Sequence, residues 1–335
     1  MDESRGNLLE IRGLKTLFHL FAGTVRAVDG IDLSLREQEI MGIVGESGCG
    51  KTVTAYSIMR LIDPPGEIAS GEMRFRGEDL LKKSESEMRK VRGRDISMIF
   101  QDPMTALNPL QTIHEQMDEM LRLHTEMNPA ERLEKVLDLL GEVGISNPKE
   151  RLKNYPHQFS GGMLQRVVIA IALAARPKLI IADEPTTALD VTVQAQILRL
   201  MEAVVKNHRT ALILITHDLA VVAGLTERVA VMYCGRIVEE GPTEVVIHRP
   251  RHPYTKGLLA SIPRMERPVA QSGKTLHLPQ VPGMVPSLLA LPPGCAFAPR
   301  CTAAMPICNK FPPEMQYLDE SHRAACYLYG GGTAR

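Results

Sequence analysis

The eight residues Gly45 to Thr52, with the sequence GESGCGKT, constrain the fold of this chain more than any other segment. The apolar run Ile40–Val44 precedes them, and the apolar pattern of a helix, Val53 to Leu61, follows. A glycine-rich turn between a strand and a helix lets the backbone wrap a phosphate group without Cβ clashes. The helix N-terminus adds the positive end of its dipole. The sequence therefore predicts a phosphate-binding loop in an α/β fold.

The segment has the Walker A form G-x-x-x-x-G-K-[ST], which assigns a role to each position. Lys51 is expected to reach the β- and γ-phosphates of ATP, and the Thr52 hydroxyl to ligate Mg²⁺. The alternative is a chance glycine-rich turn, which the strand and helix on either side disfavour. The residues whose backbone should surround the phosphates are Gly45, Glu46, Ser47, Gly48, Cys49 and Gly50.

A second acidic element follows in the run LIIADEP, Leu179 to Pro185. Asp183, at the end of this apolar strand, suits the Mg²⁺ role of a Walker B aspartate. Glu184 can orient and polarise the attacking water as a general base. Two solvated acids at a strand end would be the ordinary interpretation, but their position after a phosphate loop favours the functional one.

Short, continuous apolar runs indicate strands buried on both faces of a largely parallel sheet. Between these runs, Pro129–Ile145 places Leu133, Val136, Leu137 and Leu140 on one helical face, which predicts a helical insertion between Gln101 and Ser160. After about Arg251, repeated prolines, among them Pro263, Pro268 and Pro279, predict loops and a poorly cored tail. The expected strands are Glu39–Val44, Ile96–Phe100, Leu179–Ala182, Ala211–Ile215 and Val229–Met232.

Composition excludes some classes of protein. The 335 residues include 39 basic and 39 acidic side chains, so net charge offers no reason to expect a nucleic-acid partner. The longest apolar run, Val167 to Ala175, is far shorter than the roughly 18 residues of a membrane-spanning helix. The first residues, MDESRGNLLEIRG, lack the apolar core of a signal peptide. A cytosolic or peripheral protein is therefore expected.

Further motifs make the sequence resemble the ABC ATPases. FSGGMLQR, Phe159 to Arg166, is similar to their LSGGQ signature, and Phe100-Gln101-Asp102-Pro103 to their Q-loop. Ala188-Leu189-Asp190 resembles the D-loop, and His217 the switch histidine. The resemblance implies an α/β P-loop core with a mainly parallel sheet, an antiparallel β subdomain and a helical subdomain at about residues 103–175. It implies an ATPase domain over residues 1–250 and a small Cys-rich extension over 251–335.

The resemblance also implies a mechanism in which two ATPase domains sandwich two ATP molecules. The signature of one subunit, Ser160, Gly161 and Gly162, would meet the γ-phosphate held by the Walker A loop of the other. His217 would contact the γ-phosphate and hold Glu184 and the water in line. Gln101 would connect Mg²⁺ or the water to the helical subdomain and a membrane partner, and Asp190 would belong to the nucleotide site.

Two signature positions depart from the family, because Phe159 and Met163 replace its usual Leu and Gln. Retained activity is expected, since Ser-Gly-Gly is intact. An aromatic residue that stacks on adenine is expected upstream of Walker A. Phe18 and Phe21 both qualify by distance, and we favour Phe18.

The tail contains four cysteines that could bind a zinc ion or an iron–sulfur cluster as thiolates, stay free, or form regulated disulfides. HRPRHPYTKGLL, from His248, and GCAFAPRC, from Gly294, resemble the C-terminal extension of ATP-binding subunits of bacterial dipeptide and oligopeptide permeases. That resemblance implies a 4Fe–4S cluster, with Zn²⁺ as the alternative. His248 and His252 are expected to be surface or packing residues. The four cysteines are Cys295, Cys301, Cys308 and Cys326.

Taken together, the motifs predict the ATP-hydrolysing subunit of a peptide importer at the cytoplasmic face of the bacterial inner membrane. Its expected partners are a second, paralogous ATPase subunit, two transmembrane permease subunits and, indirectly, a substrate-binding protein. Alternatives are import of nickel chelates, glutathione or D-amino-acid peptides, or a soluble ABC ATPase with a redox-sensing tail.

Overall fold

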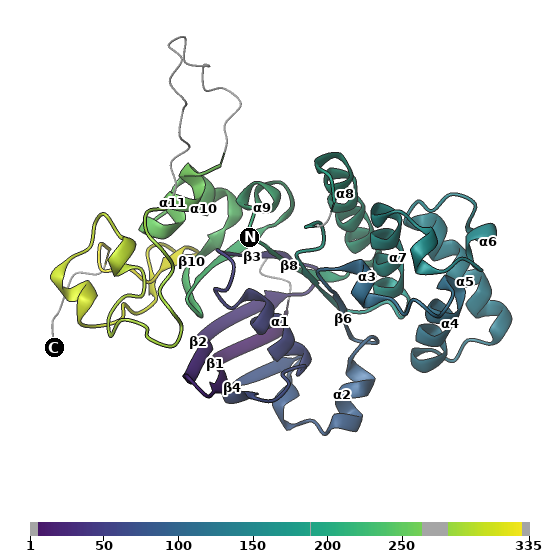
Figure 1. Cartoon of the computed structure of the whole chain (residues 1–335), viewed down its shortest axis with the longest axis horizontal. Coiled ribbons are helices and arrows are strands. Elements are labelled where there is room, and N and C mark those ends of the chain that lie inside the picture. The colour runs from purple at the N-terminus through teal and green to yellow at the C-terminus, as the bar shows by residue number, and fades with distance from the viewer. Residues whose placement is uncertain (1–5, 188, 263–280, 330–335) are drawn as a thin grey trace, which may run out of the picture.

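The computed structural model describes residues 6–187, 189–262 and 281–329. Ala188 of the expected D-loop, the prolines at 263, 268 and 279, and the first five residues lie outside the described residues. The described chain forms two sheets, a group of helices on one side and a loop-rich C-terminal region on the other (Figure 1).

The larger sheet contains all five expected strands. Its neighbouring strands β6, β7, β8, β3 and β9 are parallel, and their apolar side chains are buried on both faces. The mainly parallel sheet predicted from continuous apolar runs is therefore confirmed. Among the described residues, the strand order is β11 (Gln316–Tyr317), β12 (Arg323–Ala324), β10 (Arg236–Pro242), β9 (Arg228–Tyr233), β3 (Ile40–Val44), β8 (Ala211–Thr216), β7 (Leu179–Asp183) and β6 (Ile96–Ile99).

The smaller sheet is antiparallel and precedes most of the core in sequence. It runs in the order β2, β1, β4, β5, and its apolar face packs against helix α1 (Lys51–Met59) and the larger sheet. Helix α2 (Glu85–Val91) and a 3₁₀ turn, Leu80–Lys82, follow it. Its strands are β1 (Asn7–Leu20), β2 (Gly23–Arg36), β4 (Gly66–Phe75) and β5 (Glu78–Asp79).

Helices cover the larger sheet in the positions that parallel connections require. Helix α1 (Lys51–Met59) follows β3 and lies between the two sheets, while α8 (Val191–His208) follows β7. Helix α9 (Leu219–Leu225) connects β8 to β9. None of the helices in the described part of the chain is long and apolar enough to cross a membrane.

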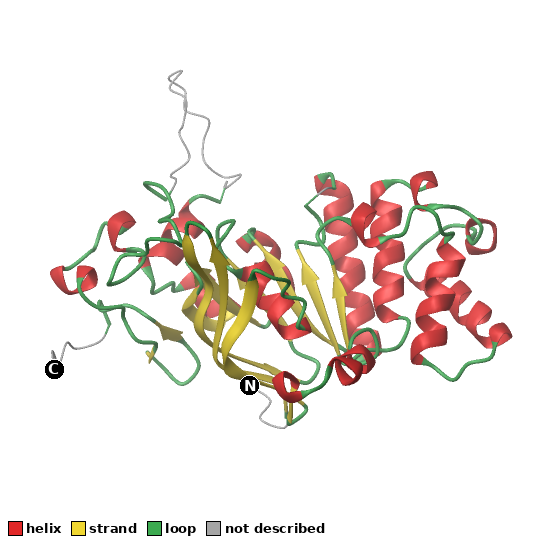
Figure 2. Ribbon diagram, turned by 60° about the horizontal axis from the view of Figure 1, so that its bottom comes forward, coloured by secondary structure: helices red, strands yellow, loops and turns green. Residues whose placement is uncertain are grey.

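The segment between β6 and β7 is helical, as its amphipathic pattern predicts, and it forms the group of helices far from the C-terminal end in Figure 2. One detail of the predicted face is wrong. Leu133 is 39% exposed, whereas Leu139 is buried with Val136 and Leu140, because the buried stripe of α5 turns toward α4 and α7. The helices are α3 (Pro103–Ala106), α4 (Ile113–His124), α5 (Pro129–Glu142), α6 (Pro148–Arg151), a 3₁₀ turn Pro156–Gln158 and α7 (Gly161–Leu173).

The region after β10 has little regular structure, as its prolines predict. Helix α10 (Thr243–His248) and α11 (Pro253–Ala260) precede residues 281–329, which contain the 3₁₀ turns Ala298–Arg300 and Pro306–Asn309. We call described residues 251–262 and 281–329 the C-terminal extension. It is joined to the core because β12 pairs with β10 and Phe297 packs on Tyr233 and Tyr254.

Candidate active site

The phosphate loop leaves the C-terminal end of β3 and enters α1, as the sequence predicts. Its glycines are required by close backbone contacts. A Cβ at Gly45 would lie 2.3 Å from the Met232 carbonyl oxygen, and one at Gly50 would lie 2.3 Å from that of Ala27. Gly50 also has φ +105°, a conformation that favours glycine. The loop can therefore adopt this path only with glycine at these positions.

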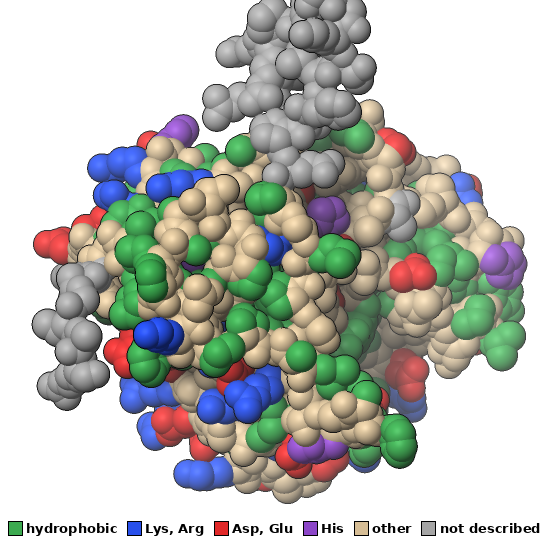
Figure 3. Space-filling model, turned by 60° about the vertical axis from the view of Figure 1, so that its left-hand side comes forward, with side chains coloured by type: hydrophobic (Ala, Val, Ile, Leu, Met, Phe, Trp, Pro, Cys, Tyr) green, Lys and Arg blue, Asp and Glu red, His purple; other side chains and the backbone are tan. Residues whose placement is uncertain are grey.

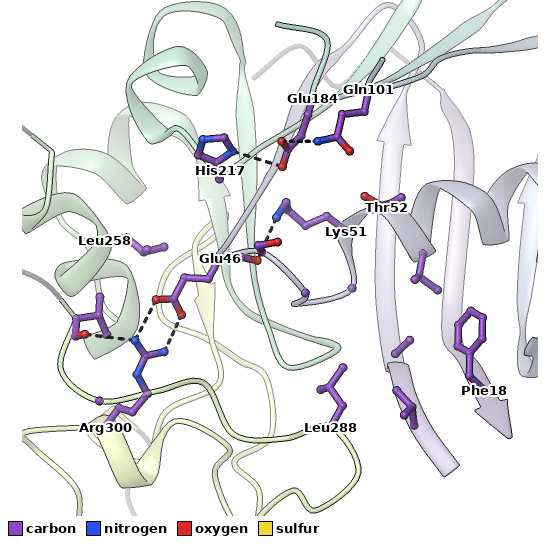
Figure 4. A pocket seen from close by; sticks show the side chains of 18 of the residues that line it. Phe18, Glu46, Lys51, Thr52, Gln101, Glu184, His217, Leu258, Leu288 and Arg300 are labelled. Carbon is purple, nitrogen blue, oxygen red and sulfur yellow. Dashed lines mark hydrogen bonds and ion pairs between the residues drawn. The ribbon is translucent and has the colours of Figure 1, made fainter. Parts of the chain in front are cut away.

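Lys51 is 4% exposed, and its ammonium group donates to the carbonyl oxygens of Gly45 (2.8 Å) and Glu46 (3.1 Å). The loop thus surrounds its own lysine, and the charge lies at the centre of the loop (Figure 4). A buried cation within a ring of backbone groups is suited to bind a triphosphate.

The donor set for Mg²⁺ lies beside this lysine. The Thr52 hydroxyl donates to the Asp183 carboxylate at 3.1 Å, which joins the start of α1 to the end of β7. Burial raises the pKa of Asp183, and the hydrogen bond from Thr52 counteracts that rise. A hydroxyl and a carboxylate oxygen are ligands that Mg²⁺ accepts, so these two residues fit the ion.

Glu184 is at the centre of a polar cluster formed by three elements. Its carboxylate accepts hydrogen bonds from Thr187 (2.9 Å) and Gln101 (3.4 Å), and Nδ1 of His217 lies 3.4 Å away (Figure 4). Glu184 adopts φ +46°, and its N–H donates to the Ile215 carbonyl. Glu184 lines the same cavity as the phosphate-loop residues Lys51 and Thr52.

A cavity of about 960 Å³ connects these groups. Lys51, Thr52, Gln101, Glu184 and His217 line it together with Phe18. Phe21 is fully exposed at the turn between β1 and β2. Of the two aromatic candidates, Phe18 is therefore the one that lines the cavity.

Comparison with known proteins identifies the family. Residues 28–187 match the ABC transporter family, and residues 238–308 match the oligopeptide/dipeptide transporter C-terminal region. The chain is 48% identical to the dipeptide transport ATP-binding protein DppD of Bacillus subtilis, with 96% of this chain and 94% of that protein covered. It is also 48% identical to the oligopeptide transport ATP-binding protein OppD of Escherichia coli, with 95% and 92% covered. The chain belongs to the ABC transporter ATPases.

Solved structures agree with this assignment. A dimeric ATP-binding cassette in a post-hydrolysis state, bound to ADP and phosphate, superimposes with a TM-score of 0.63 at 27% identity. The match covers 70% of this chain and 98% of that one. The predicted fold class and ATPase activity are thereby confirmed for the cassette.

In this ABC ATPase the signature lies apart from the nucleotide cavity of the same chain. Ser160 caps α7 by accepting a hydrogen bond from Met163 N–H at 3.4 Å, and Asp190 caps α8 in the same way. Neither these residues nor Gly161 and Gly162 are among the described residues that line the cavity. The departures at Phe159 and Met163 have a packing explanation, since both side chains contact the apolar core of the helical subdomain.

The C-terminal extension contributes residues to the cavity that the sequence motifs did not reveal. Arg300 lines it and forms two hydrogen bonds with the Glu46 carboxylate, at 2.6 and 3.0 Å. The Tyr254 hydroxyl accepts the Glu46 N–H at 2.8 Å. No signal in the sequence connects Arg300 to Glu46, which lies 254 positions earlier. Leu258, Ser261, Val281, Gly283 and Leu288 also line the cavity.

The four cysteines of the extension line one small cavity of about 20 Å³, which His252 also borders. None of the four forms a disulfide with another described cysteine, and burial raises the pKa of Cys295 to about 11 and also raises the pKa of Cys326. In the described part of the chain, no group of three ligating side chains is arranged to hold a single metal ion. His252 is buried, caps α11 and packs on Phe297, consistent with the packing role expected for it.

Proposed function

We propose that this chain is the ATP-hydrolysing subunit of an importer that takes up dipeptides and oligopeptides across the bacterial inner membrane. The observation that carries the proposal is the similarity to dipeptide and oligopeptide transport proteins over more than nine-tenths of their length. The similarity includes the C-terminal region, where residues 238–308 match the region specific to such transporters.

Hydrolysis is proposed to depend on the polar cluster at the end of β7. The oxygen of a water molecule attacks the γ-phosphorus, and the bond to the β-phosphate bridging oxygen breaks, with its electron pair leaving on ADP. Glu184 accepts the proton released by the water, and His217 and Gln101 hold the carboxylate in position. Lys51 stabilises the charge on the phosphate oxygens. Bound Mg²⁺ would be held by Thr52 and Asp183 and would neutralise part of the triphosphate charge.

The location of the signature supports a dimeric site. Ser160 caps helix α7, and Ser160 and Gly161 are exposed while Gly162 is partly buried, so a partner's γ-phosphate could reach the N-terminus of this helix. ATP would then join two subunits, with Asp190 near the shared site, and hydrolysis would release them. We propose that the second subunit is a paralogous ATPase.

The remaining partners follow from the same importer. Two transmembrane permease subunits would contact the helical subdomain near Gln101, and a substrate-binding protein would act through them. The chain would be peripheral, at the cytoplasmic face of the inner membrane. Acidic and basic side chains are both present on the face shown in Figure 3, in keeping with the zero net charge of the sequence. We propose no nucleic-acid partner.

We also propose that Cys295, Cys301, Cys308 and Cys326 hold a 4Fe–4S cluster, with Zn²⁺ as the alternative. Convergence of four cysteines on one cavity supports the proposal. Each thiolate of a cluster binds a different iron, so the sulfurs need not approach as closely as around one zinc ion. When bound, the group would supply a covalent cross-link to a region with little apolar core.

The function is tested with the four-subunit transporter in proteoliposomes, supplied with its substrate-binding protein. Labelled di- and tetrapeptides should accumulate only with ATP, and Lys51→Ala should abolish uptake by weakening nucleotide binding. Uptake of a nickel chelate, glutathione or D-amino-acid peptides, without uptake of ordinary peptides, would instead select one of those substrates. ATPase activity with no membrane partner would favour the soluble alternative.

The cofactor is tested by anaerobic purification and elemental analysis. A 4Fe–4S cluster predicts a brown protein with about four iron and four sulfide per chain. One equivalent of zinc in a colourless protein would identify the alternative. Protein that contains neither iron nor zinc would reject both the cluster and the zinc site.

A further inference from the structure

Arg300 of the C-terminal extension is almost completely buried, and its side chain is 4% exposed. Its two terminal nitrogens donate to the Glu46 carboxylate, Nε donates to the carbonyl oxygen of Pro282 (2.8 Å), and Nη2 also donates to that of Val281 (3.3 Å). The guanidinium carbon lies 5.8 Å from the ring centre of Tyr233. These contacts fix Arg300 in one orientation.

Glu46 is the second residue of the phosphate loop and lines the nucleotide cavity, where its side chain is 27% exposed and extends toward Arg300 (Figure 4). The backbone of Glu46 is also fixed by other contacts. Its N–H donates to the Tyr254 hydroxyl, and its carbonyl oxygen accepts a hydrogen bond from Lys51. The carboxylate, however, has Arg300 as its charged partner (Figure 4). A carboxylate in this position would repel a triphosphate if it were not paired.

We propose that Arg300 is a positioning residue for ATP binding, which neutralises the Glu46 carboxylate within the nucleotide cavity and turns it away from the triphosphate. The C-terminal extension is then a part of the ATP site and not only an attachment to the cassette. ATP affinity becomes dependent on whether the extension is docked.

The alternative is that Arg300 serves only to attach the extension. A second arginine of the extension provides the matched control. Arg323 pairs with the buried Glu240 at 2.6 Å, also across the junction with the core, but it does not line the nucleotide cavity. A variant at Arg323 weakens docking without changing charge near ATP.

The experiment measures ATP affinity of the purified full-length chain with a fluorescent ATP analogue and Mg²⁺, alongside its melting temperature. Arg300→Gln should weaken binding about tenfold, since it leaves one carboxylate unpaired. The double variant Glu46→Gln/Arg300→Gln should restore ATP affinity to within about threefold of wild type, because both side chains are then neutral. Arg323→Gln should lower the melting temperature with no more than about a twofold change in affinity.

The double variant separates the two explanations. If Arg300 serves only to attach the extension, the double variant should bind ATP no better than Arg300→Gln. That outcome overturns the proposal. Unchanged affinity in Arg300→Gln also overturns it. If Arg300→Gln does not fold, Arg300→Lys, which keeps the charge, should bind more tightly than Arg300→Met, and equal affinities would reject neutralisation. Loss of binding in wild type would instead contradict the ATPase assignment, so the two failures are distinguishable.

Discussion

The five parallel strands of the cassette and the C-terminal extension lie side by side, but different interactions hold them. The strands bury continuous runs of Val, Ile and Leu on both faces. The extension has strands of two residues, and it is attached through the Arg300–Glu46 and Arg323–Glu240 ion pairs and an aromatic cluster around Phe297. The sheet therefore tolerates loss of any one polar contact, whereas the extension depends on a few specific contacts.

The largest effect is expected for ATP hydrolysis, because the residues proposed to catalyse it lie in the cassette and not in the extension. Glu184→Gln should lower ATP hydrolysis by about 10²- to 10⁴-fold, because the water loses its proton acceptor, while ATP binding is retained. Phosphate release by the assembled complex is the measurement. Glu202→Gln, at a position of helix α8 whose side chain is 34% exposed, is the matched control and should keep full turnover. Substantial turnover without the Glu184 carboxylate would remove this residue as the base.

The next largest effect concerns stability of the sheet. Leu214 in β8 is completely buried, so Leu214→Ala should lower the free energy of unfolding by about 2–5 kcal/mol. Leu289 in the extension is 44% exposed, and Leu289→Ala should cost less than about 1 kcal/mol. Urea unfolding followed by circular dichroism measures both. Equal costs would show that the extension contains an apolar core comparable to that of the sheet.

A smaller effect on stability is expected from the hydrogen bonds that the extension forms. Tyr254 is completely buried, and Tyr254→Phe leaves the Glu46 N–H without its acceptor, at a cost of about 1–2 kcal/mol. The Tyr329 hydroxyl donates to the Arg251 carbonyl in a partly exposed position, where water can replace it. Tyr329→Phe should therefore cost less than half as much in thermal unfolding. A larger cost at Tyr329 would contradict the importance of the contact at Glu46.

The smallest effect is expected in the helical subdomain. Hydrogen bonding to Arg132 holds the pKa of Asp118 below its usual value, so this pair stabilises the fold above about pH 4 and ceases to do so as pH falls through the lowered pKa. Asp118→Asn should cost about 0.5–1 kcal/mol at pH 7 and progressively less as the pH falls below about 4. Unfolding across this pH range, with Asp138→Asn on the exposed face of α5 as control, is the measurement. A cost independent of pH would reject the ion pair as its source.

Local patterns in the sequence predicted much of this arrangement. Continuous apolar runs identified the parallel strands, and the motifs identified the phosphate loop, Asp183 and the residues around Glu184. The predicted face of α5 was partly wrong, because Leu133 and Leu139 are both compatible with an amphipathic helix and only the neighbouring helices decide which is buried. The choice between Phe18 and Phe21 likewise required the cavity.

The sequence by itself determined the strand–loop–helix unit and the order of the catalytic motifs, because these depend on residues close together in the chain. Only the tertiary structure decided that Arg300 pairs with Glu46, that Tyr254 holds the loop from outside, and that the extension lines the nucleotide cavity. Ion pairs between distant segments leave no periodicity or spacing in a sequence. They depend on how the extension folds back along β10 and onto the phosphate loop.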